Sequence, residues 1–299
     1  MENYNIGGRL YTVSEPWLQD IVLLDKENYI FELDHLSVIK VSGKAAAEFL
    51  QGQLTCDIRL INQHQMQFGA LCNVKGRILA LLDVIFWNNE FFLILPKDLA
   101  QAVVCKLEKV ALLARVTCEL LNNLVIYGLC IDHAAANVMH KIILPEILQG
   151  VTATATTYCY AMAKGMYIVI AQDNHTAIVK PQGAVHKRSL AWHLLELQAH
   201  RYTIYPITSG AFLPHRLNLH NMGYISFTKG CYKGQEIIAR MHYRSNLDNY
   251  KCNVVTLNIN HNPSIGEKLL LDANQKHAGL VVDYCPTHIP DNYVVALSY

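Results

Sequence analysis

The residues best suited to chemistry lie in the segment ISFTKGCYKGQEIIAR at positions 225–240, where two glycines four apart bracket a cysteine. A helix is expected to begin at Gly234, which would place Cys231 just before a helix N-terminus. Unpaired backbone N–H groups and the helix dipole favour an anion there. Lys229 and Lys233 flank the cysteine and add positive charge. Together these features favour the thiolate, which is the reactive form of cysteine.

The same residues also suit a purely structural turn. Gly230 and Gly234 would then shape the backbone, and Cys231 would simply pack. Gln235 and Glu236 would be ordinary residues of a first helical turn, although Glu236 could also hold a lysine or a ligand amide. Spacing alone does not decide between a reactive cysteine and a packed one.

Other common chemistries leave no trace in the sequence. The phosphate-binding, nucleophile-elbow and zinc-protease patterns GxGxxG, GxxxxGK[ST], GxSxG and HExxH are all absent. The nine cysteines are at least twelve residues apart, which excludes Cys-x-x-Cys redox pairs and paired zinc ligands. We therefore expect seven or eight of them to be buried small hydrophobes, and no stable metal site.

The composition is that of an ordered chain with almost no net charge. Its 299 residues are 52% apolar and 16% charged, and 25 Lys+Arg against 24 Asp+Glu leave no overall field for nucleic acid. Positions 1–10 do not resemble a signal peptide. The best candidate for a membrane span, 78–87, has half the length needed and contains Asp83. The expected location is the cytoplasm, with no direct nucleic-acid or membrane partner.

Hydrophobic periodicity predicts an α+β fold. Residues 67–95 are expected to form a three-stranded antiparallel meander, followed by a helix after Pro96. Further strands are expected near 28–41, 116–131 and 156–171, and Ser189 should cap a helix through Leu197. Asp132 should cap another helix, with Ala135, Val138, Met139 and Ile142 on its apolar side. Four short strands after Lys251 predict a small β-domain, so we divide the chain into 1–245 and 246–299.

The segment Lys229-Gly230-Cys231-Tyr232-x-Gly234-Gln235-Glu236 resembles the K-G-C-[FY]-x-G-Q-E signature of the YgfZ family. These folate-binding proteins act in iron–sulfur cluster assembly and repair and are related to the T-protein of glycine cleavage. The resemblance continues in family order over residues 49–244: FLQGQLTCD at 49–57, NVKGR at 73–77, positions 192–200 and SGAFLP at 209–214.

The resemblance implies two interleaved ferredoxin-like or Greek-key subdomains that form a ring, plus a small C-terminal antiparallel β-barrel. Tetrahydrofolate would lie in the central opening. The residues implied to bind it or to shape its site are Gln198, Asn73, Lys75, Tyr232, Gln235, Glu236 and Arg240. Cys231 and Lys229 would be the chemical pair, with Lys229 keeping the thiolate ionised and Cys231 able to hold iron or sulfur transiently.

Two departures from the wider superfamily bear on activity. T-proteins carry an aspartate on the strand after the hairpin, whereas residues 77–82 are RILALL and Asp83 is expected on the opposite strand face. Gln198-Ala199-His200 replaces a Glu-Ala-Gly that grips the pterin, and an amide matches only part of the pterin donor pattern. Glu196 is expected to point elsewhere on its helix.

Three functions remain open from the sequence. The favoured one is a folate-binding accessory protein that supports [4Fe–4S] client proteins, including tRNA-modifying enzymes, and is not an ordinary enzyme. The alternative is a tetrahydrofolate-dependent aminomethyl or one-carbon transferase, which the missing aspartate disfavours. The third is a scaffold that has lost folate and works through protein contacts.

Overall fold

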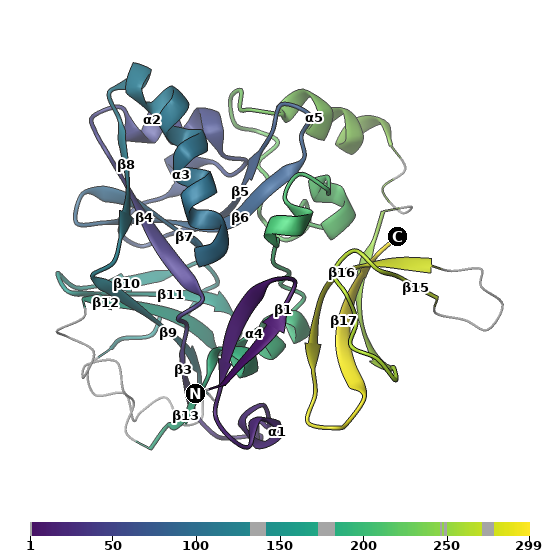
Figure 1. The fold of residues 1–299 in the computed structure, drawn as a ribbon. Helices are drawn as coiled ribbons and strands as arrows, with labels where there is room; N and C mark the ends of the chain where they lie inside the picture. The colour runs from purple at the N-terminus through teal and green to yellow at the C-terminus, as the bar shows by residue number, and fades with distance from the viewer. Residues whose placement is uncertain (1, 132–141, 173–182, 246, 248–249, 271–277) are drawn as a thin grey trace.

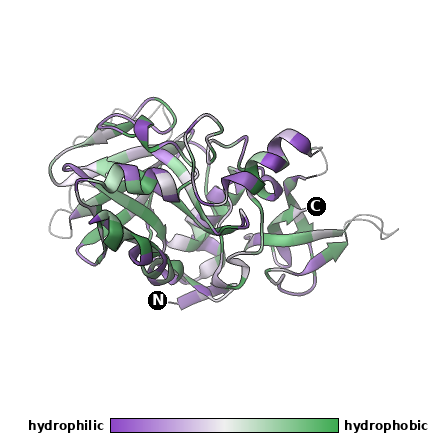
Figure 2. Cartoon of the chain, turned by 90° about the horizontal axis from the view of Figure 1, so that it is seen from above, coloured by the Kyte–Doolittle hydropathy of each residue, from purple (hydrophilic) through white to green (hydrophobic). Residues whose placement is uncertain are grey.

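The computed structural model describes residues 2–131, 142–172, 183–245, 247, 250–270 and 278–299. The expected helix at Asp132 lies outside these residues. The described chain forms an α+β fold whose strands gather into two large sheets, a C-terminal sheet and an N-terminal hairpin (Figure 1). Hydrophobic residues concentrate on the strands (Figure 2). No helix among the described residues is long and apolar enough to cross a membrane.

A five-stranded antiparallel sheet contains the predicted meander. Its order is β5 (Gln67–Cys72), β6 (Ile78–Trp87), β7 (Glu90–Pro96), β4 (Leu36–Ser42) and β8 (Thr117–Leu121). Helices α2 (Ala46–Gln53) and α3 (Lys97–Ala111) pack beside it (Figure 1). Leu99, Val103 and Leu107 are buried on one side of α3, which confirms the predicted helical spacing after Pro96.

A six-stranded sheet forms the second large layer. Its order is β10 (Val151–Ala153), β11 (Thr157–Ala163), β12 (Met166–Gln172), β9 (Leu124–Cys130), β3 (Tyr29–Glu32) and β13 (Val185–Lys187). The β3–β13 pair is parallel. Helix α4 (Ser189–Gln198) follows β13 and lies so close to β9 that a Cβ at Gly128 would be 2.5 Å from the Trp192 ring.

The predicted cap of α4 is wrong in detail. Arg188 is the N-cap residue, and no side chain caps the helix. The Ser189 hydroxyl instead accepts a hydrogen bond of 2.8 Å from the backbone N–H of Thr12. Ser189 therefore joins α4 to the N-terminal hairpin of β1 (Glu2–Ile6) and β2 (Arg9–Val13), which the sequence analysis did not predict.

The C-terminal segment forms the four strands that were predicted. They make an antiparallel sheet in the order β14 (Cys252–Asn258), β17 (Asn292–Ser298), β16 (Ala278–Pro286) and β15 (Lys268–Leu270). Closure into a barrel stays a prediction. Buried Asp283 joins this sheet to α4, because its carboxylate is 3.1 Å from His193 Nε2 and accepts a 2.6 Å hydrogen bond from the Tyr205 hydroxyl.

Among the described residues, the remaining helices have ten residues or fewer. They are α1 (Trp17–Asp20), α5 (Gln235–Arg244) and the 3-10 turns η1 (Ile58–Leu60), η2 (Leu112–Ala114), η5 (Pro206–Thr208) and η6 (Pro214–Leu217). Helix α5 starts one residue after Gly234, as predicted, and lies beside the tips of β5 and β6 (Figure 1). The turn between these strands thereby reaches the segment around Cys231.

Candidate functional site

The loop that carries Cys231 is fixed to a distant segment, residues 51–57. The backbone N–H of Ser226 donates to the Thr55 carbonyl at 2.9 Å, and that of Lys233 donates to the Gly52 carbonyl at 3.1 Å. The Thr55 hydroxyl donates to the Tyr224 carbonyl at 2.6 Å. Both segments were selected from the sequence, and the structure brings them together as adjoining backbones.

Lys229 does not face the thiol as the sequence analysis expected. Its buried ammonium donates to three backbone carbonyls, those of Gln51, Leu54 and Cys56, at 2.7, 2.8 and 2.6 Å. These carbonyls lie at and beyond the C-terminal end of α2, where unpaired oxygens favour a cation. Burial lowers the pKa of Lys229 to about 8, so the side chain is still mainly charged at neutral pH. Lys229 is a structural clamp of the loop.

Glycine is required where the β5–β6 turn meets the start of α5. Gly234 has a φ of 84°, and a Cβ on it would be 2.5 Å from the Asn73 carbonyl oxygen. A Cβ on Gly76 would be 3.1 Å from Ile238. The turn and the helix therefore pack backbone to backbone. The Asn73 side-chain oxygen accepts hydrogen bonds from the backbone N–H groups of Lys75 and Arg77, which gives this predicted cofactor ligand a turn-forming role.

The Cys231 side chain is exposed, and α5 begins four residues later. This placement before a helix N-terminus agrees with the sequence prediction. Gly230 beside it is also exposed, with no atom within 4 Å of where a Cβ would stand. The thiol therefore lies at the open crest of a loop whose two ends are anchored.

The other predicted site residues around this loop differ in exposure. Lys75, Glu236 and Arg240 are exposed, whereas Gln235 is half-buried. Tyr232 is buried, and its ring centroid is 5.1 Å from the Lys229 ammonium. One face of the ring is thus covered by the Lys229 ammonium, and the expected contact of Tyr232 with folate stays a prediction.

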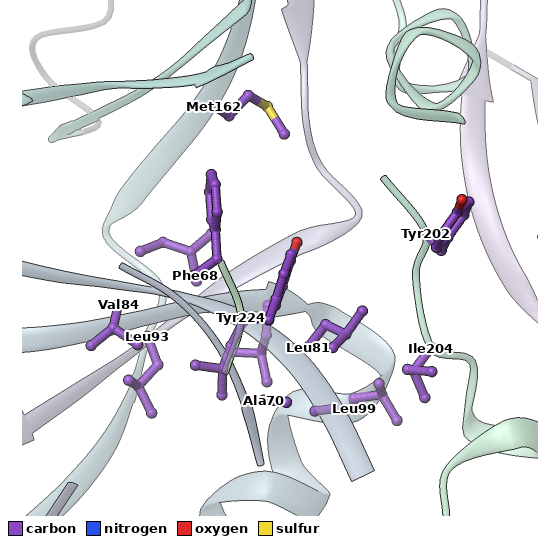
Figure 3. Close-up of a cluster of buried hydrophobic side chains, with 14 of the residues drawn as sticks. Phe68, Ala70, Leu81, Val84, Leu93, Leu99, Met162, Tyr202, Ile204 and Tyr224 are labelled. Carbon is purple, nitrogen blue, oxygen red and sulfur yellow. The ribbon is translucent and has the colours of Figure 1, made fainter. Parts of the chain in front are cut away.

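A second site lies between the two large sheets, where a polar cavity of about 60 Å³ is lined by Asp83, Glu196 and Arg201. Asp83 accepts a 2.7 Å hydrogen bond from the Tyr160 hydroxyl and one of 3.3 Å from Arg201 Nη2. The Arg201 guanidinium carbon is 4.1 Å from the Phe68 ring centroid. Figure 3 shows Phe68 and Tyr224 side by side below Met162.

The side chain of Glu196 does not lie where the sequence predicted. It lines the polar cavity, and burial raises the pKa of its carboxyl to about 7. Gln198 is exposed and lines a different cavity, with Leu194 and Tyr29. Of the two residues, Glu196 is therefore the one that lines the cavity between the two large sheets, and folate contact by Gln198 stays a prediction. Glu196 is the one charged residue in the α4 sequence SLAWHLLELQ, a signal that could have marked it.

A larger, mostly apolar cavity of about 470 Å³ adjoins the polar one and shares Met162 and Arg201 with it. Phe68, Tyr167 and Met222 are among its other lining residues. A volume of this size is typical of a small-molecule site, whereas the polar cavity alone is not. The pair suits a ligand with an apolar body and one polar edge.

Curated relatives of this chain include tRNA-modifying proteins named YgfZ. The chain is 30% identical over 221 residues to the tRNA-modifying protein YgfZ of Colwellia psychrerythraea, which covers 73% of this chain and 68% of that protein. The tRNA-modifying protein YgfZ of Blochmanniella pennsylvanica is 27% identical over 268 residues, or 85% of this chain and 81% of that protein. The chain belongs to the YgfZ family. No family model matches it.

A solved structure confirms the type of fold for this member of the YgfZ family. The glycine cleavage system aminomethyltransferase T of Bartonella henselae aligns with a TM-score of 0.76 over 99% of this chain and 86% of its own, at 19% identity. At that identity the likeness concerns the fold. It agrees with the α+β class predicted from the sequence.

A histidine cluster packs beneath the Cys231 loop of this YgfZ-family chain. The ring centroids of His215 and His220 are 4.9 Å apart, and those of His215 and His242 are 5.9 Å apart. His242, on α5, stacks on Phe227 at 3.7 Å. Both ring nitrogens of buried His215 have no hydrogen-bond partner among the described residues. Burial lowers the pKa of His215 to about 4, and that of His220 is lowered by the same cause and by His242.

These shifts predict acid-induced loss of stability. Below the unfolded pKa of about 6.5 the unfolded chain takes up protons that the folded chain does not, so stability falls as the pH drops toward 4. His215→Phe should flatten the decline of unfolding free energy between pH 7 and 4 by roughly 2 kcal/mol. Urea unfolding at several pH values measures this. His64→Phe, at an exposed histidine, is the control, and equal slopes in both variants would contradict the prediction.

Proposed function

We propose that this protein is a folate-binding accessory factor that supports assembly or repair of [4Fe–4S] client proteins, including tRNA-modifying enzymes. The observation that carries the proposal is Cys231, an exposed thiol at the crest of an anchored loop before α5. The relatives described as tRNA-modifying proteins support the link to tRNA modification. The expected location is the cytoplasm, and the expected partners are folate and iron–sulfur proteins.

Tetrahydrofolate is the proposed cofactor, and the adjoining polar and apolar cavities are the proposed site. A pterin presents a polar edge, and the rest of the molecule offers an aromatic body for the 470 Å³ cavity. The ring of two interleaved subdomains and the closed C-terminal barrel, implied by the family, belong to this proposal.

Cys231 would act together with groups from a client protein. A stable cluster needs about four cysteine-type ligands, so one thiolate can hold iron or sulfur only in passing unless a partner completes the set. An exposed thiolate can also undergo reversible oxidation. Both roles need the thiol itself, which makes its replacement by a hydroxyl the direct test.

Cys231→Ser should fail to complement cells that lack their own YgfZ-family protein, while the unfolding transition stays unchanged because the side chain is exposed. Cys105→Ser is the matched control, since Cys105 is also exposed but lies on α3. It should complement fully. Full complementation by Cys231→Ser would overturn the proposed role of the thiol.

The folate proposal is tested by calorimetric titration of the reduced protein with tetrahydrofolate under anaerobic conditions. Saturable binding in the micromolar range is expected. The absence of binding up to millimolar concentration would remove folate from the function and leave a role for Cys231 alone.

A transferase remains the second candidate, because the cavity holds two carboxyl groups, those of Asp83 and Glu196, that sequence reasoning had not placed there. A carboxyl beside a folate could support proton transfer. Incubation with tetrahydrofolate and an aminomethyl-loaded carrier protein is the test, read out as methylene-tetrahydrofolate. We expect no turnover above background, and turnover would favour the transferase.

A further inference from the structure

The exposed surface beside the Cys231 thiol is formed by α5 and the β5–β6 turn. Glu236, Arg240, Tyr243 and Arg244 follow the spacing of one helix face, and all four are exposed. The helix lies at the rim of the molecule, beside the tips of β5 and β6 (Figure 1). This face of α5, together with the exposed side chains of residues 74–77 and Lys233, is called the α5 surface below.

The α5 surface carries an excess of positive charge. Its acid is Glu236, and its bases are Lys75, Arg77, Lys233, Arg240 and Arg244, all exposed or half-buried. None of these side chains forms an ion pair with another described residue. The chain as a whole has a formal net charge of only +1, so the excess is local. Charge that is not neutralised within the protein is available to a partner of opposite sign.

Tyr243 is an exposed but positioned aromatic side chain on this surface. It is 71% exposed, yet its ring packs edge-on against the rings of His242 and Phe227, with centroid distances of 4.9 and 6.3 Å. Val74, at the tip of the turn, is 73% exposed, and Ile237 is half-buried. Tyrosine and arginine carry much of the binding energy at protein interfaces, and a side chain that is already held in place loses little entropy on binding.

The mixture of charged and apolar side chains favours a protein partner over a nucleic acid. A phosphate backbone is bound through positive charge, whereas the apolar side chains of Val74 and Ile237 gain from burial against another protein. We propose that the α5 surface docks an acidic face of a [4Fe–4S] client protein and thereby brings the client's cysteines to Cys231. This inference rests on the proposed function, in which the client supplies the ligands that one thiolate lacks.

The test measures how tightly the full-length protein binds the apo form of a purified [4Fe–4S] tRNA-modifying enzyme, by biolayer interferometry under reducing conditions. Arg244→Glu should weaken the affinity by about 10-fold or more at low salt. The difference should shrink as salt is added, because salt screens exposed charges. Tyr243→Ala should weaken the affinity by about 10-fold at every salt concentration, because its contribution is mainly burial.

Matched variants separate docking from other effects. Arg244→Lys keeps the charge and should lose less affinity than Arg244→Glu. Lys106→Glu makes an equivalent charge reversal at an exposed residue of α3 and should bind as the unaltered protein does. Cys231→Ser should also bind normally, because docking does not need the thiol. The thermal unfolding of each variant confirms that it is folded.

The outcomes separate this inference from the proposed function. Equal affinity of Arg244→Glu and the unaltered protein, equal weakening by Lys106→Glu, or no binding of the enzyme overturns the inference. Bulk tRNA is the second probe and should not bind. Binding of tRNA but not of the enzyme, weakened by Arg244→Glu, assigns the surface to nucleic acid and also overturns the inference. The role of the thiol is judged separately, by whether Cys231→Ser complements.

Discussion

Gly234→Ala is expected to lower the free energy of unfolding by about 3 kcal/mol or more. The residue has a φ of 84°, in the left-handed region, and a Cβ would be 2.5 Å from the Asn73 carbonyl oxygen and 2.9 Å from Gly76 Cα. The obstacle is backbone on both sides, so no side-chain rotation relieves it. Urea unfolding, followed by circular dichroism, measures the change.

Gly230→Ala is the matched control within the same signature. Gly230 has no atom within 4 Å of an added Cβ, and its φ is not in the left-handed region. Its substitution should change the unfolding free energy by about 0.5 kcal/mol or less. A similar loss in both variants would show that the backbone contact between the β5–β6 turn and α5 does not carry the effect.

Lys229→Met is expected to cost about 3 kcal/mol of stability, because it leaves three buried carbonyls without their common donor. Methionine keeps much of the length and apolar character of the side chain, so the change isolates the ammonium. Chemical unfolding at pH 7 measures the loss.

Lys233→Met tests whether position in the signature matters more than contact. Lys233 is half-buried, and its backbone N–H donates to the Gly52 carbonyl. The substitution keeps this hydrogen bond because it changes only the side chain. Its effect should be within about 0.5 kcal/mol. Equal destabilisation by the two substitutions would refute the clamp role assigned to Lys229.

Much of the scaffold follows from local sequence patterns. Residues 67–95 alternate apolar runs with Asn/Gly turns, and these local signals were enough to predict β5, β6 and β7. The start of α5 followed from Gly234. By contrast, the β1–β2 hairpin was missed although Gly7-Gly8 marks its turn, because its strands are short and rich in polar residues. The predicted burial of seven or eight cysteines was too high, since six are buried, one is half-buried and two are exposed.

The site was predictable as a set of segments but not as a set of contacts. Spacing singled out the segment around Cys231, and the resemblance to the YgfZ family identified those around Gln51 and Asn73, which do meet it. It did not give the direction of individual side chains, and therefore assigned Lys229 to the thiol. For the same reason the sequence did not show that Glu196 lines the central cavity and that Gln198 does not. The two residues are two positions apart on α4 and so lie on different sides of it. Which side faces the cavity depends on how α4 packs against the strands, a tertiary property.

The clamp formed by Lys229 makes the display of Cys231 conditional on folding. The ammonium joins residues 173 to 178 positions apart in the chain, and it supplies the positive charge that the carbonyl end of α2 favours. The three carbonyls come together only where the end of α2 is folded, and the loop's hydrogen bonds to Gly52 and Thr55 depend on the same segment. A chain in which the end of α2 is unfolded therefore carries Cys231 on a loop that has lost this anchor. The organised display of the Cys231 thiol is thus coupled to a segment far away in the sequence, so damage to α2 would disturb the cysteine without touching it.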